Sequence, residues 1–267
     1  MEKDNHSNSK LYWDETSAEY QDVTRIATND FHYGPLLPGD SIVGALPEIK
    51  RGMKCLELGA GVGQNSIFLA SQGAHCLATD ISAEQLKFGE TIANAMGLNL
   101  DFEVLNLDEL DPAQLGFWDF IHSTWAFPFS ADQETLVSKC AQMLKKGGRL
   151  HITTGHPIFA GEWIELEEHE QGMFVSDYFT PPREVRFTKD EEFFIRTQQF
   201  PLSTYINWII ESGLTLKRVL ELKPVDLDLL SKQDFENSCP YDSEIWREMY
   251  PQIKKIPFVV TYIAEKL

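Results

Sequence analysis

The stretch that decides the fold is Leu56-Glu57-Leu58-Gly59-Ala60-Gly61-Val62-Gly63-Gln64. An apolar run there ends in alternating glycines and a helical pattern follows, so we expect a strand, a tight turn and a helix. Glycines in such a turn let a ligand approach the backbone, and the first N–H groups of the helix are free to bind it. The third glycine of a dinucleotide fingerprint would fall at Gln64, and the Gly-Lys-Ser/Thr of a phosphate loop is absent. The turn therefore predicts a ligand site without naming the ligand.

Around this turn, short apolar runs alternate with helical patterns. The predicted strands are residues 55–58, 75–79, 102–105, 118–121 and 149–153. The predicted helices are residues 65–71, 83–95 and 131–144, the second opened by a capping box at Ser82 and the third closed by Lys146-Gly147-Gly148. Strands that alternate with helices indicate a parallel sheet with helices on both faces.

The alternation stops at residues 155–200. An acidic stretch, residues 162–170, is followed by strand-like runs at 173–179, 184–188 and 192–198, with turn residues between them. We interpret this part as an inserted antiparallel unit and not as a second domain. A helix at 203–212 and strands at 215–222 and 258–264 then return to the core, where they could add an antiparallel edge.

Composition excludes several classes of function. The 267 residues include 41 acidic and 23 basic ones, a net charge of −18, and this argues against a nucleic-acid binder and against docking on anionic lipid. No apolar run approaches the ~18 residues of a membrane span, and the polar N-terminus predicts no signal peptide. The four cysteines lie far apart without a C-x-x-C pair, so we expect reduced thiols, no metal site and a cytoplasmic protein.

Polar residues end the strands that follow the glycine turn. Asp80 ends the second strand, where its carboxylate can accept both hydroxyls of a ribose. Asn106-Leu107 ends the third, where an amide and a backbone N–H could contact an adenine edge. Glu57 could reach an amino group or orient the turn. A ligand with adenine, ribose and an ammonium group but no pyrophosphate fits this set, and S-adenosylmethionine is such a ligand.

Here the chain resembles the class I S-adenosylmethionine-dependent methyltransferases, over roughly residues 10–222 and the final strand. The matching motifs are Glu57-Leu-Gly-Ala-Gly-Val-Gly63, Thr79-Asp80-Ile81-Ser82, Asn106-Leu-Asp-Glu-Leu110, Phe117-Trp-Asp-Phe-Ile121 and Leu144-Lys-Lys-Gly-Gly-Arg-Leu150. The chain is most similar to the small-molecule branch related to quinone-biosynthesis enzymes, the methyltransferase type 11 group. Members often begin with a helix that caps the cofactor, here Tyr12-Trp13-Asp14…Ala18…Tyr20.

The resemblance implies a Rossmann-like α/β fold, doubly wound, with a mostly parallel seven-stranded sheet and an antiparallel edge strand. It also implies one domain with four parts. These are an N-terminal helical cap (1–50), the S-adenosylmethionine-binding core (51–154), an antiparallel β insert that acts as a lid (155–200) and the C-terminal part of the core (201–267).

The resemblance further implies S-adenosylmethionine as cofactor and S-adenosylhomocysteine as product. The residues expected to bind it are Tyr20, Glu57, Gly59, Ala60, Gly61, Gly63, Asp80, Ile81, Asn106, Leu107 and Ser123. Asn106 departs from the family pattern, which often has Asp there. Its amide oxygen can still accept a hydrogen bond from the adenine amino group.

Methyl transfer from a sulfonium mainly requires that the acceptor is aligned and desolvated, and a base is needed only if the acceptor must lose a proton. The segment Ser123–Phe129 lacks the Asp/Asn-Pro-Pro-Tyr/Phe of DNA amino-methylating enzymes, and Cys239-Pro240 reverses the Pro-Cys of cytosine enzymes. His122 and Ser123 stand where metal-dependent enzymes need carboxylates. These differences disfavour nucleic acid as acceptor and disfavour a magnesium site.

The acceptor pocket is expected over the carboxyl ends of the strands. Candidates to line it are His32, Tyr33, Trp125 and Phe127. His156 directly follows the fifth strand and is the candidate general base, although a histidine that only holds the insert in place fits the sequence equally well.

We therefore expect methyl transfer from S-adenosylmethionine to a small-molecule acceptor, without nucleic acid or membrane as partner. One alternative is a non-catalytic regulator that binds S-adenosylmethionine or S-adenosylhomocysteine and has no accessible acceptor pocket. A second alternative is a nicotinamide-dependent oxidoreductase. The oligomeric state is left open, with a homodimer among the options.

Overall fold

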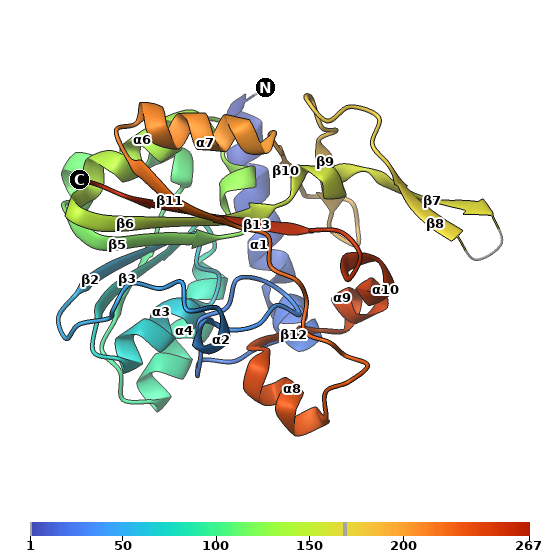
Figure 1. The fold of residues 1–267 in the computed structure, drawn as a ribbon. Helices are drawn as coiled ribbons and strands as arrows, with labels where there is room; N and C mark the ends of the chain where they lie inside the picture. Colours follow the sequence, from blue (N-terminus) through green and yellow to red (C-terminus); the bar gives the residue numbers. More distant parts are fainter. Residues whose placement is uncertain (1, 168–169) are drawn as a thin grey trace.

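The computed structural model describes residues 2–167 and 170–267, arranged around one central sheet (Figure 1). The sheet has seven strands in the order β11-β13-β6-β5-β2-β3-β4. Their bounds are Lys54–Leu58 (β2), His75–Asp80 (β3), Asp101–Val104 (β4), Trp118–Thr124 (β5), Leu144–Gly155 (β6), Thr215–Leu220 (β11) and Val259–Glu265 (β13). Neighbours from β6 to β4 pair in parallel, whereas β13 pairs antiparallel with both β6 and β11. The predicted fold class is confirmed, with the antiparallel strand one position in from the edge.

Helices cover both faces of this sheet, with α3 and α4 on one side and α6 and α7 on the other (Figure 1). Their bounds are Gln64–Ser71 (α3), Ala83–Ala95 (α4), Gln133–Met143 (α6) and Leu202–Glu211 (α7), and a short α5 spans Pro112–Leu115. Successive residues of a strand point to opposite faces, so Cys55 packs into one hydrophobic cluster and Leu56 into the other. The predicted cap of α4 is confirmed, because Ser82 accepts a hydrogen bond from the backbone N–H of Gln85.

The N-terminal part folds over the carboxyl ends of the parallel strands. It consists of α1 (Glu2–Val23), β1 (Thr24–Ile26) and the short α2 (Asp40–Val43). β1 pairs antiparallel with β12 (Tyr241–Ser243), so segments more than 200 residues apart lie side by side. The remaining C-terminal helices are α8 (Lys232–Ser238), α9 (Glu244–Glu248) and α10 (Tyr250–Ile253).

The insert contains two antiparallel pairs. β7 (Glu162–Glu167) pairs with β8 (Glu170–Phe174) and projects from the molecule, whereas β9 (Glu184–Phe187) pairs with β10 (Phe194–Thr197) beside α1 (Figure 1). The antiparallel character agrees with the sequence, but the boundaries differ. The acidic stretch itself forms β7, and most of the run predicted at 173–179 lies outside any strand. Trp163 and Ile164 are adjacent, so the stretch lacks the two-residue period that would predict a strand. Pairing with β8, which places Trp163 opposite Met173, makes it one.

A second difference concerns the end of α6. Lys146-Gly147-Gly148 was predicted to close this helix, but the helix ends at Met143 and the glycines lie inside β6. Gly147 has φ of +77°, and the backbone of Lys266 exchanges hydrogen bonds with Gly147 and Gly148. The C-terminal segment therefore converts this turn-like sequence into the irregular start of a strand.

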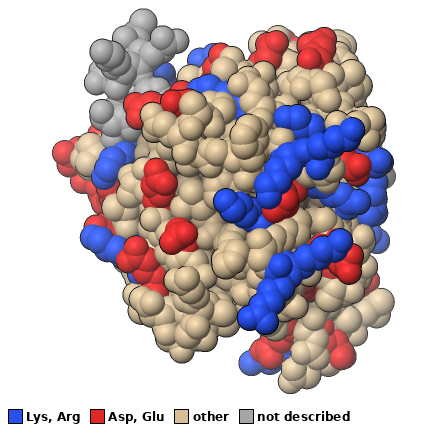
Figure 2. Space-filling model, turned by 90° about the vertical axis from the view of Figure 1, so that its left-hand side faces the viewer, with Lys and Arg blue, Asp and Glu red and all other residues tan. Residues whose placement is uncertain are grey.

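The excess negative charge is not spread evenly over the surface. Figure 2 shows a face on which Lys and Arg side chains gather among Asp and Glu. Basic groups of the central sheet are paired with carboxylates, for example Lys145 with Asp119 at 2.8 Å and Lys217 with Glu265 at 3.6 Å. Exposed pairs of this kind contribute little stability. Within the described residues, no helix has both the length and the apolar character needed to cross a membrane.

Candidate functional site

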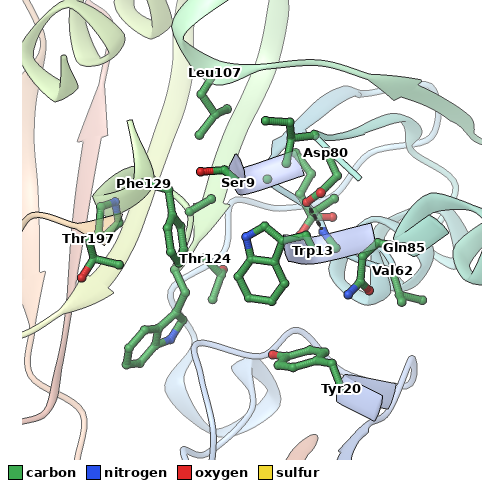
Figure 3. A pocket seen from close by; sticks show the side chains of 18 of the residues that line it. Ser9, Trp13, Tyr20, Val62, Asp80, Gln85, Leu107, Thr124, Phe129 and Thr197 are labelled. Atoms are coloured by element: carbon green, nitrogen blue, oxygen red, sulfur yellow. Dashed lines mark hydrogen bonds between the residues drawn. The ribbon is translucent and has the colours of Figure 1, made fainter. Parts of the chain in front are cut away.

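A cavity of about 250 Å³ lies at the carboxyl ends of the parallel strands, beneath α1. Its walls come from the glycine turn after β2, the end of β3, the loop after β4 and the loop after β5. Figure 3 shows Trp13 of α1 within the cavity, facing Phe129, and the two rings meet edge to face at 5.7 Å. α1 therefore covers the site as a cap.

The glycine turn presents its backbone to this cavity. Gly59, Gly61 and Gly63 have φ of +66°, +57° and +79°, the left-handed region that favours glycine. A Cβ at Gly59 would lie 2.0 Å from the Cβ of Ala126, so that position is closed by protein. A Cβ at Gly61 would meet nothing nearer than a side-chain oxygen of Gln85 at 4.0 Å. Gly61 is thus the glycine that leaves room for a ligand against the backbone.

Asp80 at the end of β3 is held rigidly beside the turn. One carboxylate oxygen accepts a hydrogen bond from the N–H of Gly61 at 2.7 Å (Figure 3). The other accepts one from the N–H of Ser82 at 2.9 Å. Burial raises the pKa of Asp80, and the backbone N–H groups of Ser82, Gly61 and Ile81 oppose that rise. Each oxygen keeps lone-pair capacity on the cavity side, which suits the two hydroxyls of a ribose.

Glu57 is buried on β2 and touches the cavity. One of its carboxylate oxygens accepts hydrogen bonds from the N–H and the hydroxyl of Ser66, at 3.0 and 2.6 Å, which ties the strand to the first turn of α3. Burial raises the pKa of Glu57 to about 8, against the hydrogen bonds from Ser66. Glu57 therefore orients the turn and offers a group that a nearby cation would ionise.

The adenine end of the predicted site is built by the loop after β4. The side-chain oxygen of Asn106 accepts a hydrogen bond from the N–H of Asp108 at 3.1 Å and starts the short helix η1 (Leu107–Glu109). Asn106 and Leu107 line the cavity together with Ile81 and Leu105. The loop thus combines polar and apolar contacts suited to a heterocycle.

The structure brings most of the predicted site residues together. Those in the cavity wall are Tyr20, Glu57, Gly59, Ala60, Gly61, Asp80, Ile81, Asn106, Leu107, His32 and Trp125. Gly63, Ser123, Tyr33 and Phe127 lie outside it. Ser123 is buried and its hydroxyl donates to the carbonyl of Leu58, while the cavity is reached by its neighbour Thr124.

Tyr33 and Phe127 are structural in this fold. The hydroxyl of Tyr33 donates to a carboxylate oxygen of Asp40, which fixes the loop at the start of α2. Phe127 packs in the hydrophobic cluster under α6, and the adjacent Pro128 and Phe129 face the cavity instead. Neither Tyr33 nor Phe127 lines the cavity, whereas His32 and Phe129 from the same two loops do.

His156 does not line the cavity. β6 runs on to Gly155 and carries His156 past the site, where its Nε2 lies 2.8 Å from a carboxylate oxygen of Glu221 and its Nδ1 accepts from the N–H of Ile158. Burial lowers the pKa of His156, and Glu221 opposes this shift. These contacts fit the structural alternative, in which His156 anchors the start of the insert, and they give no support to a general-base role.

His32 enters the cavity wall from the loop before α2. Its backbone N–H donates to the side-chain oxygen of Asn65 at 2.8 Å, and the Asn65 amide donates back to the His32 carbonyl at 3.0 Å. Among the described residues, the Nδ1 of His32 has no hydrogen-bond partner. Burial lowers the pKa of His32 to about 3, so the imidazole is neutral near pH 7.

The remaining wall residues come from α1, α4, the insert and the C-terminal part. They include Ser9, Trp13, Gln21, Gln85, Glu184, Arg186, Thr197, Gln199, Tyr241 and Trp246. Apart from Trp13, which lies in the motif of the capping helix, no sequence signal marked them. These side chains reach the cavity because β1 pairs with β12 and β10 packs against α1.

Comparisons with known proteins agree with this geometry. Residues 56–152 match the family model described as a methyltransferase domain. Over 103 residues the chain is 32% identical to a ubiquinone biosynthesis O-methyltransferase of Xylella fastidiosa, an alignment that covers 39% of this chain and 42% of that protein. The chain thus matches less than half the length of this curated relative.

Solved structures share the fold over a larger part of the chain. An S-adenosylmethionine-dependent methyltransferase of Mesorhizobium loti has a TM-score of 0.63 at 20% identity, covering 85% of this chain and 96% of that one. The [4+2]-cyclase SpnF has a TM-score of 0.60 at 13% identity, covering 97% and 94%. The same fold therefore supports more than one chemistry.

The fold is that of solved S-adenosylmethionine-dependent methyltransferases, and the cavity lies where the sequence predicts the cofactor site. More particularly, residues 56–152 are similar to the methyltransferase-domain family, and this similarity spans the glycine turn, Asp80 and Asn106. The recognition made from the glycine turn and Asp80 is confirmed, and the nicotinamide alternative is set aside.

Proposed function

We propose that the protein transfers the methyl group of S-adenosylmethionine to a small-molecule acceptor. The observation that carries this proposal is the second half of the cavity. Beyond the glycine turn and Asp80, the wall continues through His32, Trp125 and Tyr241 into side chains of the insert. This extension offers aromatic surface and a few polar groups, the usual lining of a small-molecule pocket.

The chain's own residues would act chiefly by positioning. S-adenosylmethionine supplies a methyl group on a sulfonium, and its transfer leaves a neutral thioether. Asp80 and the backbone at Gly61 would hold the nucleoside, while α1 covers the site and excludes water. His32, with its pKa near 3, is a weak base.

The relative from Xylella fastidiosa, described as a ubiquinone biosynthesis O-methyltransferase, supports a small-molecule acceptor for this chain as well. A non-catalytic regulator remains the competing function, and it would bind S-adenosylhomocysteine without turning over any acceptor. Such a regulator has no need of a cavity that extends beyond the cofactor residues. The extended cavity favours the enzyme.

The test is a turnover assay with small phenols, amines and carboxylic acids as acceptors, in which S-adenosylhomocysteine release is followed by mass spectrometry. We expect acceptor-dependent release by the wild type and little by Asp80→Asn. Asp101→Asn, an exposed change at the start of β4, is the matched control and should keep wild-type turnover. Tight binding of S-adenosylhomocysteine without turnover of any acceptor would favour the regulator.

A further inference from the structure

The charges in the cavity wall are unbalanced. The described lining residues include three carboxylates, Glu57, Asp80 and Glu184, but a single Lys or Arg, which is Arg186. Glu184 and Arg186 both lie on β9 of the insert, on the side of the cavity away from Asp80's strand. An anionic group that enters this cavity therefore has one cationic side chain to meet.

The guanidinium of Arg186 is held in place, but not all of its N–H donors are used. Its Nε and Nη2 donate to the two carboxylate oxygens of Glu184, at 2.7 and 3.0 Å, which fixes the plane of the guanidinium. A guanidinium has five N–H donors, so three remain. In the described part of the chain those three have no hydrogen-bond partner, and both side chains of the pair are about half exposed. Glu184 thus holds Arg186 in place while its outer donors stay available.

Two phenols from distant segments lie next to this guanidinium. The hydroxyls of Tyr20 on α1 and Tyr241 on β12 are 2.6 Å apart, so one proton lies between them and the other has no acceptor among the described residues. Burial raises the pKa of both tyrosines, and the charge of Arg186 acts on each in the opposite direction. The phenols are therefore neutral donors near pH 7.

We propose that Arg186, together with the Tyr20–Tyr241 pair, forms a carboxylate-binding subsite in the cavity. The free guanidinium donors and the spare phenol proton suit the two oxygens of a carboxylate. A dianion such as a phosphate monoester fits less well, because Glu184 lies beside Arg186, the single Lys or Arg among the described wall residues. The carboxylate has two sources, the amino-acid end of the cofactor or the acceptor.

The first arm of the test uses calorimetry with two nucleosides. S-adenosylhomocysteine carries the carboxylate, and 5′-methylthioadenosine lacks the whole amino-acid end. If the cofactor carboxylate binds here, Arg186→Gln lowers the affinity for S-adenosylhomocysteine about 10- to 100-fold and leaves the affinity for 5′-methylthioadenosine unchanged. Arg196→Gln, on β10 of the same hairpin and outside the cavity, is the matched control and should change neither affinity. This arm does not depend on the proposed acceptor.

The second arm rests on the proposed function and uses 4-hydroxybenzoate, with 4-hydroxybenzamide as its neutral isostere, added to the S-adenosylhomocysteine complex. If the acceptor carboxylate binds here, Arg186→Gln abolishes the preference for the acid while S-adenosylhomocysteine binds normally. Two results would overturn the subsite. In the first, S-adenosylhomocysteine and 4-hydroxybenzoate bind Arg186→Gln with the same affinity as the wild type. In the second, the substitution lowers the affinities for S-adenosylhomocysteine and 5′-methylthioadenosine equally. Melting curves of Arg186→Lys and Arg186→Gln verify folding, and Arg186→Lys should retain part of the binding because it keeps the charge.

Discussion

Asp80 is held on both carboxylate oxygens by backbone N–H groups, so its remaining lone pairs face the cavity in a fixed direction. Asp80→Asn removes the charge and places an amide against one of those N–H groups. We expect S-adenosylhomocysteine to bind about 10- to 100-fold more weakly, since hydrogen bonds to charged groups contribute ~1.5–3 kcal/mol each. Calorimetry measures this change, with Asp101→Asn as control. Unchanged affinity in a folded Asp80→Asn would remove Asp80 from the cofactor site.

Glu57 gives a prediction for pH. Its folded pKa of about 8 exceeds the unfolded value of 4.5, so its contribution to stability is fully present below pH 4.5 and is lost as pH rises through 8. Glu57→Gln does not titrate. Between pH 5.5 and 8.5, the free energy of unfolding of the cofactor-free wild type should fall by roughly 2–4 kcal/mol relative to the variant. Urea unfolding at both pH values tests this, and parallel profiles would contradict it.

At the scale of elements, we expect two glycines of the turn between β2 and α3 to have different roles, because Gly59 is needed for folding and Gly61 for binding. Gly59→Ala places a Cβ 2.0 Å from that of Ala126 in a left-handed conformation, and should destabilise the protein by about 2–5 kcal/mol. Gly61→Ala meets open space and should cost only about 1–2 kcal/mol. Its Cβ enters the cavity, so S-adenosylhomocysteine should bind at least about tenfold more weakly. Thermal melting and calorimetry on both variants check this contrast, which fails if Gly61→Ala binds normally.

Some elements of this fold were predictable from local sequence patterns and others were not. The strand–glycine–helix unit, the cap of α4 and the alternating core were predictable, because short-range periodicity and capping chemistry determine them. Lys146-Gly147-Gly148 and the acidic β7 were not. The first is extended by pairing with Lys266, and the second lacks the two-residue period and is a strand through its pairing with β8. Contacts with distant chain segments overrode local preference in the first case.

At the scale of the whole molecule, β13 closes the sheet from the far end of the chain. Residues Val259 to Ala264 are all buried, and Tyr262 stacks on Tyr205 of α7 with ring centroids 5.0 Å apart. A chain that ends at Pro257 loses the seven buried side chains from Phe258 to Ala264, at ~1.5–3 kcal/mol for each large one, against a typical total stability of ~5–15 kcal/mol. We expect no cooperative unfolding transition by circular dichroism. A chain lacking only the exposed Leu267 is the control and should melt like the wild type.

The sequence by itself determined the fold class, the glycine turn and the residues at the ends of β2, β3 and β4. These follow from local chemistry, because a strand that ends in a polar residue places it at a known edge of a parallel sheet. Only the tertiary structure decided which side chains complete the far wall of the cavity. Arg186, Tyr20 and Tyr241 meet because β1 pairs with β12 and the β9–β10 hairpin docks on α1. It also moved His156 out of the site, since the length of β6 is set by its pairing with β13 and not by its own residues. Side chains brought together over such distances leave no periodic trace in the sequence, and their positions depend on packing alone.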